Sequence, residues 1–378
     1  MTVRLAPFGM DLVFSIYYLA APLLLIDLEA NPVQLGLVGT FASAVHMGMA
    51  HVMGGLSDRL GRRRLIIAAP VIFSATCLLM TQVREIWVIL ALSVVNGFCL
   101  CIYWPSLQAW IADRQTGTGL ARNIGSFNLS WTAATLAGPM LSGFLYSIYP
   151  RFPFFIAAAI ALMLFLLVFA TVQDSRPVSV EEITPADMEA SRWRRRFLYA
   201  AWVANFASWF ILANARYQFP KLARELNIPP HIIGVLLGFL GFALFLGFYL
   251  LRRTGRWHFM KDFLFGAQIL AMAGIWLIIV SRHPALFALA FLMIGLCCSM
   301  TYYSSLYYAV HLLKKKGRGS GLHESILGGG AVLGPILGGV AAQYAGLRAP
   351  YFLCVAVLAA AMGAQYLFVK RESNSTVQ

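Results

Sequence analysis

Charged residues are scarce in this sequence. Only 12% of its 378 residues are Asp, Glu, Lys or Arg, whereas 60% are hydrophobic and the mean hydropathy is +0.74. A soluble domain carries roughly 25% charged residues, so this composition excludes two or three soluble globular domains. The apolar runs do not alternate as the strands of a membrane barrel do. The sequence therefore predicts an all-α membrane protein.

Motifs of several function classes are also missing. The sequence has no Gly-x-x-x-x-Gly-Lys phosphate loop, no nucleophile elbow, no His and Asp pair for a metal and no grouped carboxylates. We therefore expect no ATPase domain, no enzymatic activity, no metal and no cofactor. The six cysteines lie inside apolar runs without metal-ligand spacing, which predicts buried reduced thiols.

Runs without any charged residue mark twelve candidate membrane spans. They cover residues 12–26, 30–57, 65–83, 86–112, 123–150, 152–173, 197–215, 226–251, 263–281, 283–313, 325–347 and 349–369. All but the first reach the roughly 17 to 25 residues that cross a bilayer as a helix. The first falls short only because Asp11 interrupts an apolar stretch that begins near Leu5. We therefore predict twelve transmembrane helices joined by short loops.

Basic residues are unequally distributed between the two sides of these spans. With the N-terminus inside, the inner segments hold 22 of the 29 Lys and Arg residues. The positive-inside rule then predicts that both termini are cytoplasmic. We expect the first span to act as its own insertion signal, without a cleavable leader. The net charge of +14 suits contact with anionic membrane lipids, and no nucleic-acid partner is expected.

The longest polar segment separates two halves of six spans each. It covers residues 173–196, between an N-terminal unit 1–172 and a C-terminal unit 197–378. The second half repeats the first at an offset near 198 residues. The matching residues are Pro22 and Gly36 with Pro220 and Gly234, Tyr103 to Leu107 with Tyr302 to Leu306, and Gly138-Pro139 with Gly334-Pro335. An even number of spans per half predicts a parallel, pseudo-symmetric repeat about an axis along the membrane normal.

The segment between the second and third spans carries the most specific motif. It reads Gly54-Gly55-Leu56-Ser57-Asp58-Arg59-Leu60-Gly61-Arg62-Arg63-Arg64. Glycines permit a tight reversal, and an Asp at a helix end can face the positive N-terminus of a neighbouring helix. The segment resembles the loop signature of the major facilitator superfamily, Gly-x-Leu-x-Asp-Arg-x-Gly-Arg-Arg, at every position. With twelve spans and the repeat, this resemblance covers essentially the whole chain.

The resemblance implies two six-helix bundles, a substrate cavity between them at the midplane, and alternating access. It also implies a monomeric protein of a bacterial-type inner membrane. By analogy, the loop would act as a cytoplasmic latch that stabilises the outward-open state. The latch residues would be Gly54, Asp58, Arg59, Gly61, Arg62 and Arg63. The second half has a degraded copy, because aligning Gly255 with Gly61 places Arg252 where Asp58 would be.

Glycines and a proline form one face of the eleventh span. Small residues three or four apart allow helices to approach closely, and a proline bends a helix. The residues concerned are Gly330, Gly334, Pro335 and Gly338, with the shorter version Gly138-Pro139 in the fifth span. The pattern looks like the signature of antiporter branches of the superfamily, which carry it in helix 5. Close packing and a direct coupling role are therefore the two interpretations.

Ionisable side chains inside a membrane each require an explanation, because one at the centre of a span costs at least about 2.5 kcal/mol. Glu324, preceded by His323, is a candidate proton carrier or a partner of the basic loop nearby. Asp11 is a candidate for proton or cation binding, or lies near the membrane surface. Arg216 either contacts an anionic substrate group or snorkels to the interface. His46, near the middle of the second span, is a further candidate to face the cavity.

Aromatic and polar side chains at matched depth predict the lining of the cavity. The candidates are Tyr17, Tyr18, Asn96, Tyr103, Trp104, Gln108, Arg216, Tyr302, Tyr303 and Tyr307. Aromatic rings with hydroxyl groups suit an amphipathic organic substrate; packing and interfacial belts are the alternatives. The drug and proton antiporter branch usually has an Arg four residues before a Gly in helix 4. Here Ser93 precedes Gly97 at that spacing.

These observations favour secondary active transport of a small organic solute, coupled to protons. Export of an amphipathic compound and uptake of an organic anion both stay open. The expected partners are the solute, H+ and membrane lipids. The alternative is a membrane sensor that retains the transporter fold without moving a solute.

Overall fold

The computed structural model describes residues 2–113, 118–173, 192–312 and 316–370, all of them helical apart from short turns. The helices are α1 (Thr2–Asp27), α2 (Pro32–Leu60), α3 (Arg62–Met80), α4 (Ile86–Asp113), α5 (Thr118–Ile148), α6 (Phe152–Thr171), α7 (Arg192–Tyr217), α8 (Phe219–Glu225), α9 (Pro230–Leu251), α10 (Lys261–Val280), α11 (Pro284–Leu312), α12 (Lys316–Ala345) and α13 (Ala349–Lys370). Each predicted span coincides with one long helix.

Apolar composition and local stop signals account for these helices. In the described part of the chain, ten helices are long and apolar enough to cross a membrane. The N-terminus of α2 is capped reciprocally, since the Asn31 backbone N–H donates to Gln34 Oε1 and the Gln34 backbone N–H donates to Asn31 Oδ1, both at 2.9 Å. Gly61, with a φ of 89°, makes the reversal from α2 to α3.

The short helix α8 was not predicted. It arises because Pro220 lacks the N–H that would bond the Arg216 carbonyl, so the helix is interrupted at Gln218. The predicted linker 173–196 also differs at its end, since α7 already begins at Arg192. Residues 174–191 lie outside the described part.

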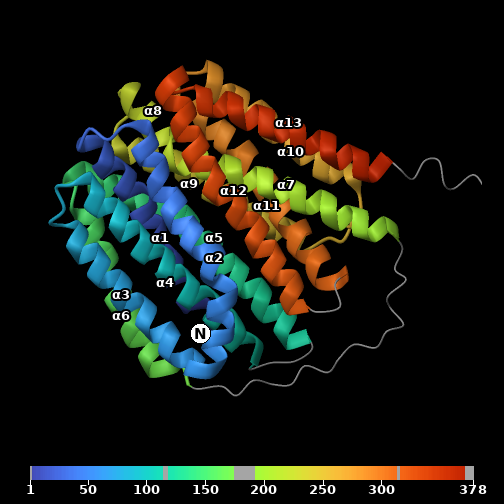
Figure 1. Ribbon diagram of the computed structural model, residues 1–378, viewed down its shortest axis with the longest axis horizontal. Helices are drawn as coiled ribbons and strands as arrows, with labels where there is room; N and C mark the ends of the chain where they lie inside the picture. Colours follow the sequence, from blue (N-terminus) through green and yellow to red (C-terminus); the bar gives the residue numbers. More distant parts are fainter. Residues whose placement is uncertain (1, 114–117, 174–191, 313–315, 371–378) are drawn as a thin grey trace, which may run out of the picture.

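The helices form two bundles that lie side by side (Figure 1). One consists of α1 to α6 and the other of α7 to α13, and they meet mainly where α5 packs on α9 and α2 packs on α12. Both α1 and α13 have their chain-terminal ends on the same side of the spans. We call this the terminal side and the opposite one the distal side.

The predicted repeat is visible in the way the bundles touch. A Cβ atom added at Gly36 on α2 would collide with the Pro335 carbonyl of α12. The repeat mate Gly234 on α9 approaches the Pro139 carbonyl of α5 in the same manner. Glycines thus bring the backbones of the two bundles into direct contact, as small residues do in membrane helix pairs.

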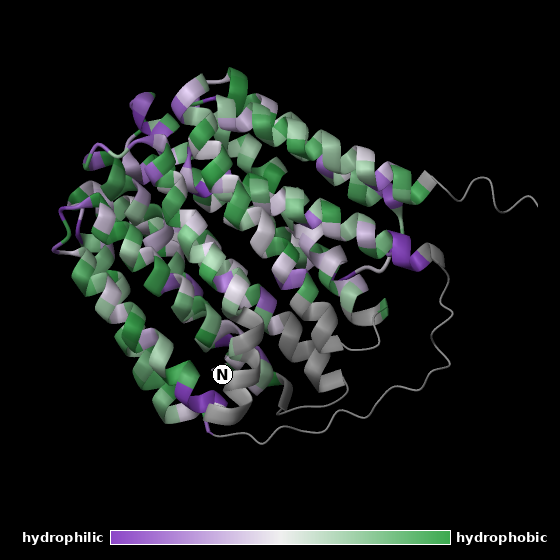
Figure 2. Ribbon diagram, in the orientation of Figure 1, coloured by the Kyte–Doolittle hydropathy of each residue, from purple (hydrophilic) through white to green (hydrophobic). Residues whose placement is uncertain are grey.

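The surface polarity fits a bilayer. Hydrophobic residues cover the outward faces of the helices, and hydrophilic residues gather at helix ends and in loops (Figure 2). Large apolar side chains such as Trp87, Met163 and Leu367 are more than 60% exposed on these faces. All six cysteines are buried and free, as predicted. Lipid in place of water explains why so much apolar surface stays uncovered.

On the distal side, α8 lies against the first bundle. Arg224 of α8 pairs with Asp27 at the end of α1 at 3.2 Å, and Tyr146 of α5 donates to the same carboxylate at 2.6 Å. The Lys221 ammonium donates to the Ala30 carbonyl at 2.9 Å. The contacts of Arg224 and Lys221 join the two bundles at their distal ends.

Deeper contacts continue this distal closure towards the membrane centre. The Gln218 side-chain amide donates to the carbonyls of Pro32 and Pro335, both at 3.2 Å. Thr40 of α2 donates to the Val332 carbonyl of α12 at 2.9 Å. These hydrogen bonds between the bundles all lie on the distal half.

Candidate functional site

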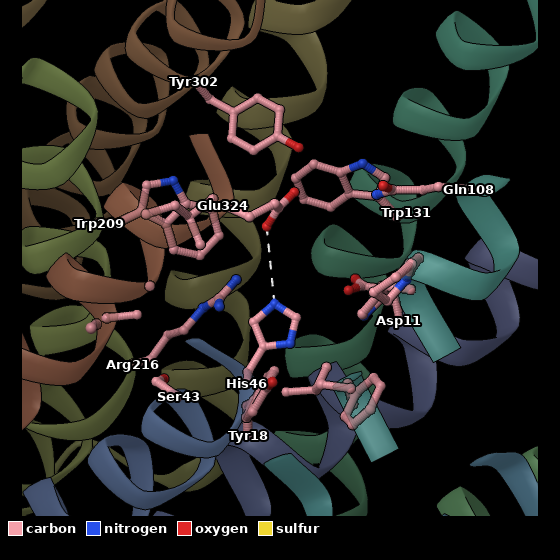
Figure 3. A pocket seen from close by; sticks show the side chains of 18 of the residues that line it. Asp11, Tyr18, Ser43, His46, Gln108, Trp131, Trp209, Arg216, Tyr302 and Glu324 are labelled. Carbon is pink, nitrogen blue, oxygen red and sulfur yellow. Dashed lines mark ion pairs between the residues drawn. The ribbon is translucent and has the colours of Figure 1, made fainter. Parts of the chain in front are cut away.

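A cavity of about 170 Å³ lies between the bundles, on the terminal side of the Thr40 contact (Figure 3). Helices α1, α2, α4 and α5 line it from one bundle and α7, α11 and α12 from the other. Its walls consist of Asp11, Phe14, Tyr18, Ser43, His46, Leu100, Trp104, Pro105, Gln108, Phe127, Trp131, Trp209, Ala213, Arg216, Tyr217, Tyr302, Glu324, Leu327, Gly328 and Ala331.

Glu324 and His46 form an ion pair across the two bundles. The distance from His46 Nε2 on α2 to Glu324 Oε2 on α12 is 3.9 Å, and both side chains are partly buried. The other ring nitrogen, His46 Nδ1, lies 3.9 Å from the Cys101 thiol of α4. A carboxylate and an imidazole at this distance can bind or release a proton, and a change in either charge alters the attraction between α2 and α12.

Asp11 is held on the wall of the first bundle. Its Oδ2 accepts hydrogen bonds from the Thr135 hydroxyl at 2.8 Å and the Ser15 hydroxyl at 3.2 Å. Ser15 follows one turn later on α1, and Thr135 comes from α5. Asp11 therefore lies inside the cavity rather than at the membrane surface.

Arg216 projects into the cavity from α7. Its guanidinium carbon is 5.4 Å from the centre of the Tyr18 ring and 5.9 Å from that of Trp209, which is the geometry of cation–π contacts. The short helix α8 follows Arg216 on the distal side. Because a side chain on a helix leans towards the N-terminus of that helix, the Arg216 side chain leans away from the distal side. This placement in the cavity wall favours a substrate contact over interfacial snorkelling.

Aromatic rings form a continuous wall beside these charges. The ring of Tyr302 on α11 lies 5.9 Å from that of Trp131 on α5 and 6.3 Å from that of Trp209 on α7. Trp104 and Phe127 form an edge-to-face pair 5.8 Å apart on the first bundle. We call Trp131, Tyr302 and Trp209 the aromatic wall, and it spans both bundles.

Three predicted lining residues lie inside the first bundle instead. The Tyr17 ring packs on Phe73 and Phe154, and Tyr103 donates to the Ala6 carbonyl at 2.8 Å. Asn96 is 98% buried in α4 and does not line the cavity. Consecutive helical residues differ by about 100° in direction, so Tyr17 and Tyr103 point away from the side that Tyr18 and Trp104 face.

In the second bundle too, residues adjacent in sequence differ in whether they line the cavity. Tyr303 and Tyr307 pack on Trp257, at 5.5 and 5.3 Å between ring centres, whereas Tyr302 lines the cavity. His323 is fully buried, and its Nδ1 lies 2.8 Å from the Ser305 hydroxyl. The predicted coupling residues are thus separated, since Glu324 and Asp11 line the cavity and His323 does not.

Several lining residues were not predicted, although helical spacing contains a signal for them. Phe14 lies three residues after Asp11 and four before the predicted Tyr18, and Trp209 precedes Arg216 by seven. Side chains at these spacings share one face of a helix. The sequence could not show which face of α5 turns inwards, so Trp131 was missed.

The predicted latch is described only in part. The side chains of Gly54, Asp58 and Arg59 lie outside the described residues. The Arg62 guanidinium donates to the Ala109 carbonyl at 2.6 Å, and that of Arg63 donates to the Val172 carbonyl at 2.7 Å. These two arginines join α3 to the terminal-side ends of α4 and α6 in the same bundle.

The predicted packing glycines lie at close helix contacts. Cβ atoms added at Gly330, Gly334 and Gly338 of α12 would collide with Phe206, Phe210 and Asn214 of α7, and one at Gly138 with Ser15 of α1. The backbone of Pro335 lies on another face of α12, against α2. The glycine face therefore holds α12 within its bundle while the proline meets the other bundle.

Two helical bundles related by a repeat, with a charged and aromatic cavity between them, define the class of this protein as a helical membrane transporter. The chain belongs to the Major Facilitator Superfamily, a family of transporters, whose sequence model matches residues 5–320 and 201–378. The fold agrees with solved structures of that family. A bacterial homologue of the human lysosomal transporter Spinster, in an inward-facing occupied conformation, has a TM-score of 0.77 at 15% identity over 98% of this chain and 96% of that one.

Other similarities point to the same family. The nucleoside transporter NupG gives a TM-score of 0.74 at 11% identity over 97% of this chain and 98% of that one. The Quinolone resistance protein NorA of Staphylococcus aureus is 22% identical over 176 residues, 46% of this chain and 45% of that protein. Multidrug resistance protein 1 of Bacillus subtilis is 24% identical over 40% of this chain and 39% of its own length. The chain thus matches less than half the length of these curated relatives.

Proposed function

We propose that this protein is a secondary active transporter that moves a small organic solute through the cavity by alternating access. The cavity carries the proposal, because it lies between two bundles that hydrogen bonds and an ion pair join on its distal side. Breaking those contacts while closing the terminal side would expose the same residues to the other face of the membrane. The quinolone-resistance and multidrug-resistance names of the relatives and the nucleoside-transporter name of NupG are compatible with a small organic solute.

We further propose that protons drive the movement through Glu324. Protonation of its carboxylate removes the charge that attracts His46, and so loosens α2 from α12 at the cavity. Proton binding and bundle separation are then linked, and each must favour the other to the same extent. The neighbouring titratable groups are His46, His323 and Tyr302, with Cys101 behind His46, and the cavity also holds Asp11 and Arg216.

Reconstituted protein in liposomes tests both proposals. With an imposed pH gradient and a metabolite panel, the wild-type protein is expected to accumulate or expel at least one solute. Glu324→Gln is expected to abolish the response to the gradient but to retain exchange of solute for solute, because neutral Gln keeps the cavity and cannot release a proton.

Glu85→Gln is the matched control for that variant. Glu85 is exposed between α3 and α4 and remote from the cavity, so the same substitution there is expected to leave the gradient response unchanged. A full gradient response in Glu324→Gln contradicts the coupling role. Ligand binding without movement of any solute would favour the sensor interpretation over transport. The direction in which the solute moves relative to the imposed proton gradient distinguishes export from uptake.

The motif before α3 is proposed to act as a latch on the terminal side, in a protein with both termini in the cytoplasm. Asp58→Asn is expected to lower solute flux while membrane expression stays intact, because the neutral side chain no longer attracts a helix N-terminus or an arginine. Unchanged flux in liposomes contradicts this role.

A further inference from the structure

The charged side chains of the cavity differ in whether they have hydrogen-bonded or ion-paired partners. Asp11 accepts two hydroxyl hydrogen bonds, from Thr135 and Ser15, and Glu324 has His46 as its partner. Among the residues that the structure describes, Arg216 has neither a direct ion pair nor a hydrogen bond; it lies over the rings of Tyr18 and Trp209, and the Asp11 carboxylate acts on it only through space. The N–H donors of Arg216 are therefore the charged groups of the cavity that still lack a hydrogen-bonded partner.

An unpaired guanidinium in a membrane interior is unfavourable, and an acidic ligand group relieves that penalty. The planar fork of an arginine offers two parallel N–H donors that match a carboxylate or a similar oxyanion. A cationic solute would instead meet carboxylates that already have partners, because Asp11 Oδ2 accepts two hydroxyl hydrogen bonds and Glu324 Oε2 pairs with His46. The cavity thus offers an anion a guanidinium whose N–H donors are all unused, whereas each carboxylate offers a cation only its second oxygen.

The surroundings of Arg216 indicate what is attached to the acidic group. Trp209 touches the guanidinium and belongs to the aromatic wall, which continues through Tyr302 to Trp131. A solute whose acidic group meets Arg216 therefore has its body against these rings. The cavity volume is about 170 Å³, and a cavity of roughly 150 Å³ holds one benzene ring.

We propose that the solute is an organic anion with a compact, ring-sized apolar body, bound through its acidic group by Arg216 and through its body by the aromatic wall. This proposal rests on the transport function proposed above and specifies its substrate class. Arg216 is then the residue of the second bundle that binds the acidic group. The fluorescence of the tryptophans in the aromatic wall is expected to change when the site is occupied.

Binding to the purified full-length protein tests this assignment. The probes are benzoate, benzamide and benzylammonium, which share one ring and differ in charge, and the readout is the fluorescence of the cavity tryptophans. Wild-type protein is expected to bind benzoate about tenfold or more tightly than benzamide, since a charge-assisted hydrogen bond contributes that much. Benzylammonium is expected to bind most weakly.

Variants of Arg216 distinguish an effect of its positive charge on binding from a loss of folded protein. Arg216→Gln is expected to bind benzoate and benzamide equally, and Arg216→Lys to retain part of the preference because it keeps the charge without the fork. Arg253→Gln is the matched control, since Arg253 also lies over a tyrosine ring, that of Tyr249, but outside the cavity. It is expected to behave as wild type. Thermal unfolding of each variant verifies that it is folded.

The outcomes distinguish this proposal from the transport proposal. Equal binding of benzoate and benzamide by wild type, preferred binding of benzylammonium, binding of none of the three, or a preference that survives in Arg216→Gln each overturns the anion site. Flux of a neutral or cationic solute in liposomes would then leave transport intact. Binding of benzoate that depends on Arg216, without flux of any solute, supports the anion site and contradicts transport.

Discussion

Adjacent residues on the cavity helices have different surroundings. Trp104 faces the cavity while Tyr103 is buried and bonded to the Ala6 carbonyl. Tyr302 lies in the aromatic wall while Tyr303 packs on Trp257. Residue type gives no indication of these roles, because tyrosine and tryptophan suit both a cavity and a core. The rotation of each helix decides which ring meets the solute.

Substitutions of the Tyr103 and Trp104 neighbours are therefore expected to act on different quantities. Trp104→Ala is expected to weaken solute binding by roughly 0.5–1.5 kcal/mol, the value of one aromatic contact. Tyr103→Phe is expected to leave binding unchanged and to lower stability by about 1 kcal/mol, because it loses one buried hydrogen bond. Ligand titration and thermal unfolding of both variants measure this; weaker binding in Tyr103→Phe contradicts the placement.

At the scale of elements, glycines set the distance between the bundles. Gly36 lies against the Pro335 backbone and Gly234 against that of Pro139. These contacts are backbone to backbone, so no side chain can move away to admit a larger residue. The two related helix pairs, α2 with α12 and α5 with α9, therefore close the distal half only if both positions remain glycine.

Enlarging one of these glycines is expected to open the distal side. Gly36→Val overfills a close contact, a change that costs about 1–3 kcal/mol, and the strain is relieved when α2 separates from α12. Spin-label distances between the distal ends of these helices are expected to lengthen. Gly363→Val is the control, because a Cβ at Gly363 of α13 meets no atom within 4 Å. Unchanged distances in Gly36→Val contradict this account.

The contact of α8 with α1 gives a second prediction for the distal side. Asp27→Asn removes the ion pair with Arg224 and weakens the hydrogen bond from Tyr146, so the distal ends are expected to separate more often. Spin-label distances between the distal ends of α2 and α9 measure this. Glu29→Gln, at an exposed position two residues away, is expected to have no effect. Equal distances in both variants contradict a holding role for α8.

At the scale of the whole molecule, an even number of spans puts both chain ends on one side, and basic residues predict that this side is cytoplasmic. The six native cysteines are buried, so an introduced cysteine is labelled almost alone. Glu85→Cys lies on the distal side and Arg195→Cys on the terminal side, both exposed. A membrane-impermeant maleimide is expected to label only the first in intact cells and both after permeabilisation. The reverse pattern contradicts the orientation.

The sequence by itself determined the number of spans, their order and the repeat, because charge is excluded from a helix in lipid whatever its neighbours are. The spacing of Gly36, Pro139, Gly234 and Pro335 was likewise readable before their contacts were known. Glu324, Asp11 and Arg216 were nominated for the same reason, since a charge inside a span is rare enough to stand out.

Only the tertiary structure decided how those charges are combined. It paired Glu324 with His46 from another bundle, gave Asp11 its hydroxyl donors and left Arg216 beside the aromatic wall. It also excluded Tyr17, Tyr103 and His323 from the cavity. The physical reason is that the scarcity of charge locates the spans along the chain, whereas the rotation and packing of helices far apart in sequence determine which side chains meet.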